Sequence, residues 1–330
     1  SEAMLNDVFT VVKYEFLAMR RSSRMWLGAI IYTAMGLLAG LVYIWVVRGI
    51  RDGAVKLVTQ QGANAYAAST AVDQSIDQFY PKMIFGLIRF FARCEANIAD
   101  VAACTDKAAT LSTCDASICA MYNSLIDVSP ILLVAFWGTL TFLPFFIVLL
   151  SFDQMASDVQ YRSVSYPLLR ISRISLYVGK FVSHALLFLA LTLLLNTTLF
   201  VMGWLLLDGF HITAGLLFQL RTYALLIPFG LCYLALVSCW SSFVRSPFLA
   251  LLFSYASLFG LFILNQFRRT AELEAPWKFL SYIAYLSPSN WEWGLWSPKF
   301  VTLAETIVVY LVFAAVFGGL GLWRFMNRDL

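Results

Sequence analysis

Charged residues are scarce in this sequence. Aspartate, glutamate, lysine and arginine make up 13% of its 330 residues, whereas hydrophobic residues make up 61%. A water-soluble domain has about 25% charged and about 45–50% apolar residues, so the composition argues against an ordinary soluble domain. The formal net charge is only +4, and no basic face of any length is left outside the apolar runs. Nucleic acid is therefore not expected as a partner.

Catalytic groups are nearly absent as well. The two histidines, His184 and His211, are far apart in the sequence. An intramembrane protease would need a His-Glu-x-x-His motif or a pair of aspartates inside apolar runs, and neither occurs. The Gly-Lys pair at 179–180 is no phosphate-binding loop, because Ile174 replaces its first glycine and Phe181 its magnesium-binding serine or threonine. We expect no catalytic residue, metal site or cofactor in this chain; any ATP and magnesium must be bound by another chain.

Six apolar runs of about twenty residues fill much of the chain. Each is long enough to cross a hydrocarbon core of about 30 Å as an α-helix, and the runs are continuous rather than alternating, unlike the strands of a barrel. The sequence predicts an all-α membrane protein with a single domain over residues 1–330. The six predicted transmembrane helices are residues 25–47, 131–150, 181–207, 222–240, 247–265 and 302–323.

Lysine and arginine in the short loops predict the orientation, because cytoplasmic loops carry an excess of them. Basic residues precede the first predicted span, lie between the second and third, and follow the last. The opposite side fits this rule less well, since it would also hold basic residues: Arg48, Arg51, Arg268 and Arg269. The pattern predicts a multi-pass protein of the bacterial inner membrane with both termini in the cytoplasm.

Residues 4–24 are predicted to form an amphipathic helix on the cytoplasmic membrane interface. Apolar residues recur there at helical spacing, with the charged residues off that stripe, so the basic side chains can reach lipid head groups. The helix either only anchors the chain or also contacts a partner. The candidate residues of this interface helix are Lys13, Glu15, Arg20 and Arg21.

Residues 48–130 are predicted to form an extracytoplasmic segment between the first two spans. It contains four cysteines: Cys94, Cys104, Cys114 and Cys119. An even number of cysteines in an oxidising compartment favours two disulfides, with three possible pairings. Metal binding is the alternative, although the spacings are wide and no histidine is near. This segment is also where a periplasmic partner could bind.

Residues 266–301 form a second predicted outer segment, which is rich in tryptophan and tyrosine. These residues are typical of the boundary between membrane and water. Pro288 and Pro298 break the segment into short pieces, so we expect one or two short helices that enter the outer leaflet. An ordinary aromatic belt is the alternative interpretation.

Several short motifs, taken in order, resemble the permease subunits of type-two ABC exporters. Residues 12–16 followed by 20–22 are similar to the amphipathic start of these proteins, 286–289 to a Leu-Asn-Pro element before their last span, and 323–330 to their basic tail. In the loop between the second and third spans, the family has an acidic residue, a Pro-x-x-Arg element and a Gly-Lys pair. The positions that match are Asp158, Pro167, Arg170, Arg173, Gly179 and Lys180.

The resemblance implies that residues 151–180 form a cytoplasmic coupling loop for a separate ATPase. A short helix at 153–166 would dock on that ATPase; Asp158 and Arg162 would share one of its faces, and Pro167 would end it. Many members have glutamate and Gly-Thr where this chain has Asp158 and Arg162-Ser163. The basic residues at 170, 173 and 180 are expected either to bind lipid phosphates or the ATPase, or only to fix the topology. The candidate coupling residues are Asp153, Asp158, Arg162, Pro167, Arg170 and Arg173.

The implied function is that of a non-catalytic permease subunit. Its implied partners are two copies of an ABC ATPase, which bind ATP and magnesium, and a second permease copy, identical or related. Because the spans hold few charges, the exported substrate is expected to be amphipathic or lipid-like. One alternative is conformational work on a periplasmic protein, since residues 166–184 are similar to permeases that help mature the copper sites of nitrous oxide reductase. A passive channel or receptor is another.

Overall fold

The computed structural model describes residues 2–60, 113–157, 171–207, 210–271, 285 and 287–327. These residues form helices and no strand, as the sequence predicts. The helices are α1 (Glu2–Arg21), α2 (Ser23–Gln60), α5 (Thr113–Leu125), α6 (Pro130–Ser151), α8 (Arg173–Leu206), α9 (Ile212–Phe243), α10 (Pro247–Ala271), the 3-10 helix η4 (Pro288–Trp296) and α12 (Phe300–Met326).

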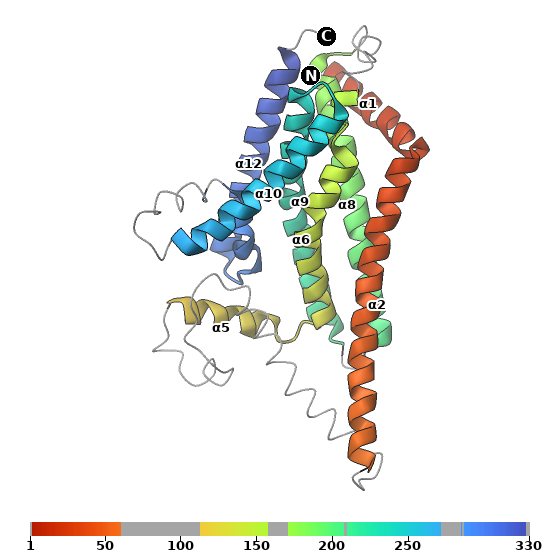
Figure 1. Ribbon diagram of the computed structural model, residues 1–330, viewed down its shortest axis with the longest axis vertical. Coiled ribbons are helices and arrows are strands. Elements are labelled where there is room, and N and C mark those ends of the chain that lie inside the picture. The colour runs from red at the N-terminus through yellow and green to blue at the C-terminus, as the bar shows by residue number, and fades with distance from the viewer. Residues whose placement is uncertain are drawn as a thin grey trace.

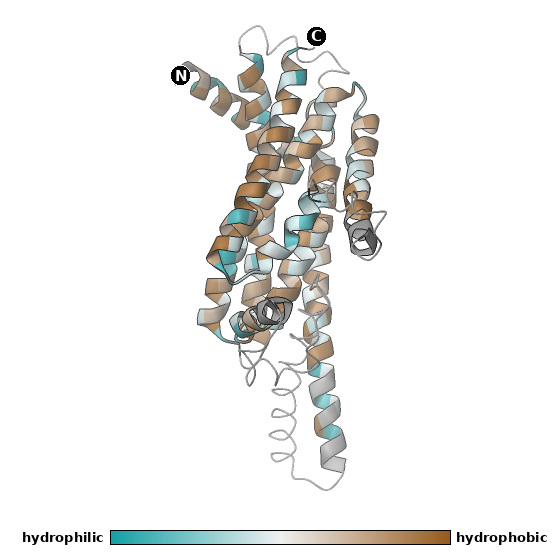
Figure 2. Cartoon of the chain, turned by 90° about the vertical axis from the view of Figure 1, so that its left-hand side faces the viewer, coloured by the Kyte–Doolittle hydropathy of each residue, from teal (hydrophilic) through white to brown (hydrophobic). Residues whose placement is uncertain are grey.

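Six of the described helices are long and apolar enough to cross a membrane, which confirms the predicted number of spans. Figure 2 shows hydrophobic residues along most of their length. The candidate spans are Met25–Gly49, Pro130–Ser151, Arg173–Leu206, Ile212–Phe243, Pro247–Leu264 and Phe300–Met326.

Two span boundaries differ from the sequence prediction by more than one turn. The third span begins at Arg173 rather than at residue 181, and the fourth at Ile212 rather than at residue 222. In both cases a basic residue, Lys180 or Arg221, stands directly before the apolar run. The helix already begins upstream of that residue. The loop predicted at 151–180 is therefore shorter, because its last eight residues belong to α8.

The first predicted outer segment is also shorter at its start. α2 continues as one helix to Gln60, so residues 48–60 prolong the first span instead of beginning a separate segment. Figure 1 shows α2 extending beyond the other helices. Residues 61–112 lie outside the described residues. In α5, the side chains of Met121, Tyr122 and Leu125 are buried in the core.

The centre of the bundle is α9. It packs against α6, α8, α10 and α12. α1 and the end of α12 lie at the same end of the bundle, and α1 lies at an angle to the long helices (Figure 1). At this end α6 passes into residues 151–157, which we call the exit turn.

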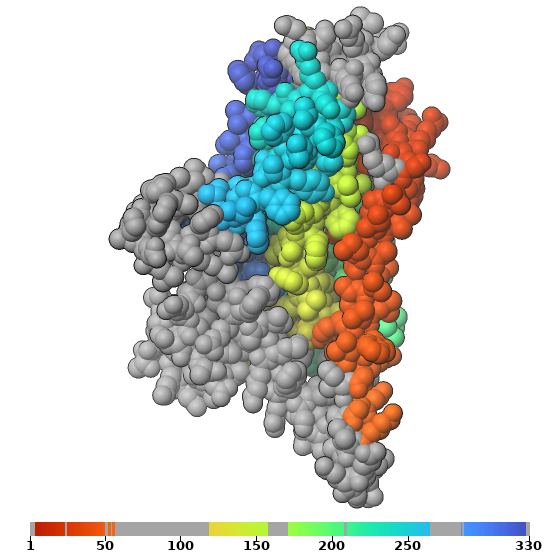
Figure 3. Space-filling model, in the orientation of Figure 1, coloured from red at the N-terminus to blue at the C-terminus, as the bar shows by residue number. Residues whose placement is uncertain are grey.

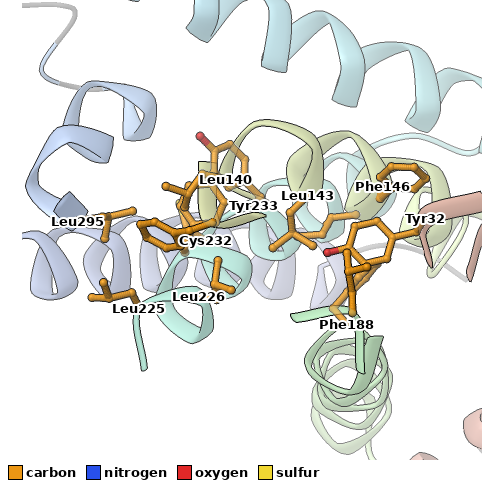
Figure 4. Packing of buried hydrophobic residues seen from close by; sticks show 14 of the residues in the cluster. Tyr32, Leu140, Leu143, Phe146, Phe188, Leu225, Leu226, Cys232, Tyr233 and Leu295 are labelled. Carbon is orange, nitrogen blue, oxygen red and sulfur yellow. The ribbon is translucent and has the colours of Figure 1, made fainter. Parts of the chain in front are cut away.

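Close helix packing joins α2 to α8. A Cβ at Gly36 would collide with Leu195, and a Cβ at Gly40 would collide with Leu199. Glycines four residues apart let helix backbones approach closely in a membrane. Figure 4 shows the neighbouring core, where Tyr32 of α2 lies beside Phe146 of α6; the two ring centroids are 4.9 Å apart in an edge-to-face arrangement.

Candidate functional site

The exit turn is held on α9 by two serines. Met155 and Ala156 are fully buried in the turn. Their backbone N–H groups both donate to the hydroxyl oxygen of Ser241, at 2.9 and 3.0 Å. The hydroxyl of Ser238 donates to the side-chain oxygen of Gln154 at 2.9 Å. The fourth span therefore fixes both the backbone and a side chain of the turn.

Lys180 of α8 connects the exit turn to α1. Its ammonium nitrogen lies 2.8 Å from Oε1 of Glu15 and donates to the backbone oxygen of Gln154 at 3.3 Å. The residue is 7% exposed, and a buried ammonium group is tolerated only when it is paired. Lys180 thus holds α1, α8 and the exit turn in one arrangement. We call Lys180, Glu15, Gln154, Ser238 and Ser241 the junction.

Glycine at position 179 brings α1 close enough to reach the junction. A Cβ at Gly179 would lie 2.6 Å from the Cβ of Val11 on α1, closer than real Cβ atoms approach. A small hydrophobic cluster fills the space beside this contact and combines residues of α1, the exit turn, α8 and α12. Its buried members are Val11, Met155, Leu176, Tyr177 and Phe325.

The same part of α8 also binds the end of α12. The guanidinium of Arg173 donates to the backbone oxygen of Met326 at 2.9 Å, which suits a cation at a helix C-terminus. The hydroxyl of Tyr177 donates to the backbone oxygen of Gly318 at 3.1 Å. A displacement of the first turns of α8 would therefore change its contacts with α1, α12 and the exit turn together.

Two polar atoms at the exit turn have no hydrogen-bond partner among the described residues. They are the side-chain nitrogen of Gln154 and the hydroxyl oxygen of Ser151, and both residues are buried. Buried polar groups are normally paired, and a partly satisfied network is costly. The hydrogen-bond network of the exit turn is therefore only partly satisfied.

Three of the residues predicted to contact a partner lie at or near the junction. Glu15 pairs with Lys180, and Arg173 binds the end of α12. Asp153 is half-buried in the exit turn, and its backbone oxygen accepts a hydrogen bond from the hydroxyl of Ser157 at 2.7 Å. The structure places them together but does not test their predicted roles.

The other predicted residues are exposed or lie outside the described part of the chain. Those exposed on α1 are Lys13, Arg20 and Arg21. Those outside the described residues are Asp158, Arg162, Pro167 and Arg170, so that their role in coupling stays a prediction.

Sequence reasoning missed the neutral members of the junction. Gln154, Ser238 and Ser241 carry no charge and match no motif. One signal was present: Ser238, Ser241 and Ser242 recur at spacings of three and four near the end of the fourth span, which places them on one helix face. All three are fully buried, and a buried polar face requires a hydrogen-bonding partner.

The outer segment at 266–301 contains η4, one short helix of the kind expected there. Arg221 of α9 donates to the backbone oxygens of Leu295 and Ser297, at 3.1 and 2.7 Å. The hydroxyl of Tyr310 donates to the backbone oxygen of Pro288 at 3.0 Å. The tryptophans of η4 are partly buried and pack against the core. They therefore do more than mark the membrane boundary.

The predicted disulfides fall mostly outside the described residues. Cys94 and Cys104 lie there, and the side chain of Cys114 is not described. Cys119 is buried in α5, and the free cysteines of the described residues are Cys232 and Cys239. The predicted pairing stays a prediction. No group of three His, Cys, Asp or Glu residues in the described ranges could hold a metal ion.

No curated protein matches this chain. The family described as ABC-2 family transporter protein matches residues 9–330, a range that includes all six candidate spans, the junction and the larger part of α1. The match confirms the resemblance seen in the sequence motifs. The chain therefore belongs to the ABC-2 transporter permease family and is a multi-pass membrane subunit of a transport system.

Proposed function

We propose that this chain couples a separate cytoplasmic ATPase to the export of an amphipathic or lipid-like substrate across the bacterial inner membrane. Two copies of the ATPase bind ATP and magnesium. Two permease copies form the pathway, and this chain contributes no catalytic group. ATP-driven closure of the ATPase pair moves the loop between α6 and α8, and that motion opens or closes the pathway.

The junction is the observation that carries this proposal. A loop that transmits force must be attached to the spans that it moves. The exit turn is bonded to α9 through Ser238 and Ser241, and to α8 and α1 through Lys180. Because α9 packs against four other long helices, a displacement of the turn has a direct route to the whole bundle.

The end of the bundle that holds the junction also indicates the proposed orientation. α1, the exit turn and the end of α12 lie there together (Figure 1), and so do the exposed basic residues Arg20 and Arg21. Cytoplasmic ends of spans are enriched in such residues. We therefore assign the junction to the cytoplasmic side, where an ATPase can reach it.

Charge reversal in the loop tests the proposal. Asp158→Lys and Arg162→Glu should each reduce ATPase co-purification and the stimulation of ATPase turnover, because loss of one member of a buried, hydrogen-bonded charge pair costs about 2–5 kcal/mol at an interface. Lys56→Glu, in the extension of α2 away from the junction, is the control and should leave both unchanged. Normal ATPase association and turnover in a double variant that combines Asp158→Lys and Arg162→Glu would contradict the coupling role and favour a channel or receptor.

A further inference from the structure

One face of α1 packs against the bundle. Val11 and Met19 are buried, and Glu15, which lies between them in the sequence, pairs with Lys180 of α8. Residues four apart in a helix lie on the same side of it, so Val11, Glu15 and Met19 form what we call the inner face of α1. The inner face is the part of α1 that contacts the junction.

A second face of α1 is apolar but exposed. Leu5, Phe9 and Phe16 are 64%, 72% and 39% exposed. Their spacings of four and seven residues place them on one side of the helix, and we call them the outer face. Figure 3 shows α1 projecting from the bundle beside the start of α2. A row of large apolar side chains on a projecting helix requires an apolar environment.

The turn between α1 and α2 places this environment at the membrane surface. The indole N–H of Trp26, at the start of the first span, donates to the backbone oxygen of Arg20 at 2.8 Å. Trp26 is exposed, and tryptophan at the end of a span is typical of the boundary between membrane and water. The end of α1 is therefore fixed at that boundary. Because α1 lies at an angle to the long helices (Figure 1), it runs along the membrane surface with its outer face toward the acyl chains.

Two arginines lie at the same boundary. Arg20 and Arg21 are exposed in the last turn of α1, and Arg20 borders the outer face because it follows Phe16 by four residues. We call Arg20, Arg21 and Trp26 the α1–α2 corner. Guanidinium groups bind phosphate oxygens through two parallel hydrogen bonds. Basic residues beside an apolar face that enters the membrane attract acidic lipids, so the chemistry of the corner fits their head groups.

We propose that acidic phospholipids bind the α1–α2 corner and thereby regulate the junction. They bind the arrangement in which α1 lies along the membrane with its outer face inserted, and in this arrangement Glu15 of the inner face reaches Lys180. A ligand that binds one of two arrangements shifts the population toward it. Acidic lipid therefore stabilises the attachment of α1 to α8 and to the exit turn. Its effect on an ATPase rests on the proposed function, whereas lipid binding and the attachment of α1 do not.

Photo-crosslinking of the full chain in nanodiscs of phosphatidylglycerol and phosphatidylcholine tests the membrane contact. The photoreactive residue p-benzoylphenylalanine replaces Phe9 in one variant and Tyr14 in the other, and mass spectrometry identifies the adducts. Tyr14 is the matched control, because it is also an exposed aromatic residue of α1 but lies about 140° around the helix from Phe9. We expect phospholipid adducts at position 9 and few at position 14. Equal adducts at the two positions would overturn the proposal, and so would an adduct at position 9 to added ATPase in place of lipid.

Hydrogen exchange tests the regulation of the junction. Amide exchange is compared between nanodiscs that contain phosphatidylglycerol and nanodiscs of phosphatidylcholine alone. It is followed in peptides from α1 and from the exit turn, where the amides of Met155 and Ala156 are bonded to Ser241. We expect phosphatidylglycerol to slow exchange in both segments, by about fivefold for each of the two arginines of the corner. Slower exchange in α1 alone would mean that the lipid only anchors the helix, and would overturn the regulation.

A double variant, Arg20→Gln with Arg21→Gln, should remove the difference between the two lipid mixtures. Its matched control is Lys56→Gln with Lys299→Gln, which removes the same charge at exposed positions away from the junction and should keep the difference. Equal behaviour of the two double variants would overturn the proposal. The exchange measurements contain no ATPase, whereas the charge reversals in the loop are read through the ATPase. Failure of the lipid site and failure of the coupling role are therefore distinguishable.

Discussion

Removing one partner of the ion pair between Glu15 and Lys180 should weaken the attachment of α1 to the junction. Glu15→Gln keeps the shape of the side chain but leaves the ammonium group without a carboxylate. Lys180→Met keeps most of the apolar stem of the lysine but removes the charge and the hydrogen bond to Gln154. Glu15→Gln therefore leaves the Lys180 ammonium group without its partner, and Lys180→Met leaves the Glu15 carboxylate without its partner.

The exposure of each half determines the magnitude. The Lys180 side chain is 9% exposed and that of Glu15 is 21% exposed. Breaking a buried pair by removing one partner costs about 3–5 kcal/mol, and a stranded group that reaches solvent costs less. We expect about 2–4 kcal/mol for Glu15→Gln and about 1–3 kcal/mol for Lys180→Met. The double variant should be more stable than the two separate losses predict, by about 1–2 kcal/mol.

Two assays separate stability from coupling. Denaturant unfolding in detergent gives the free energies, and ATPase turnover with the partner gives the coupling. The junction variants should keep ATPase association, because the loop at 158–170 is unchanged, but lose stimulated turnover. Lys13→Gln, exposed on the same helix, should stay within about 0.5 kcal/mol of the parent. If Glu15→Gln matches this control in both assays, the ion pair does not hold the junction.

Three further predictions concern other parts of the chain. Gly179→Ala should push α1 from α8 and lower the free energy of unfolding by about 1–3 kcal/mol, whereas Gly230→Ala, where a Cβ meets nothing within 4 Å, should be tolerated; equal stability of the two would contradict the close approach. Reporters fused at Leu330 and inserted near Asn64 should respond from opposite sides of the membrane, and signals from one side would refute the proposed topology. Mass spectrometry without reductant should find the four cysteines from Cys94 to Cys119 oxidised, and removing one bridge should destabilise the outer segment by about 2–5 kcal/mol; four free thiols would exclude the disulfides.

The six spans could be predicted because hydrocarbon thickness fixes the length of an apolar run. The start of α8 could not, because a hydropathy pattern treats a lysine as exposed, whereas Lys180 lies within α8 and is paired with Glu15 of α1. The pairing itself was beyond sequence reasoning, since Glu15 and Lys180 are far apart in the chain and each alone looks like an interfacial charge. Gln154 and Ser241 were missed because a hydrogen bond between neutral groups leaves no compositional signal.

Both large boundary errors occur at a cation, and the two cations act alike. Lys180 of α8 binds the backbone oxygen of Gln154 in the exit turn, and Arg221 of α9 binds the backbone oxygens of Leu295 and Ser297 at the end of η4. A basic residue inside a span is costly unless it has such partners. Each one therefore fixes a segment outside the spans to a long helix. The basic residues that made the predicted spans start too late thus mark the places where the bundle holds its connecting segments.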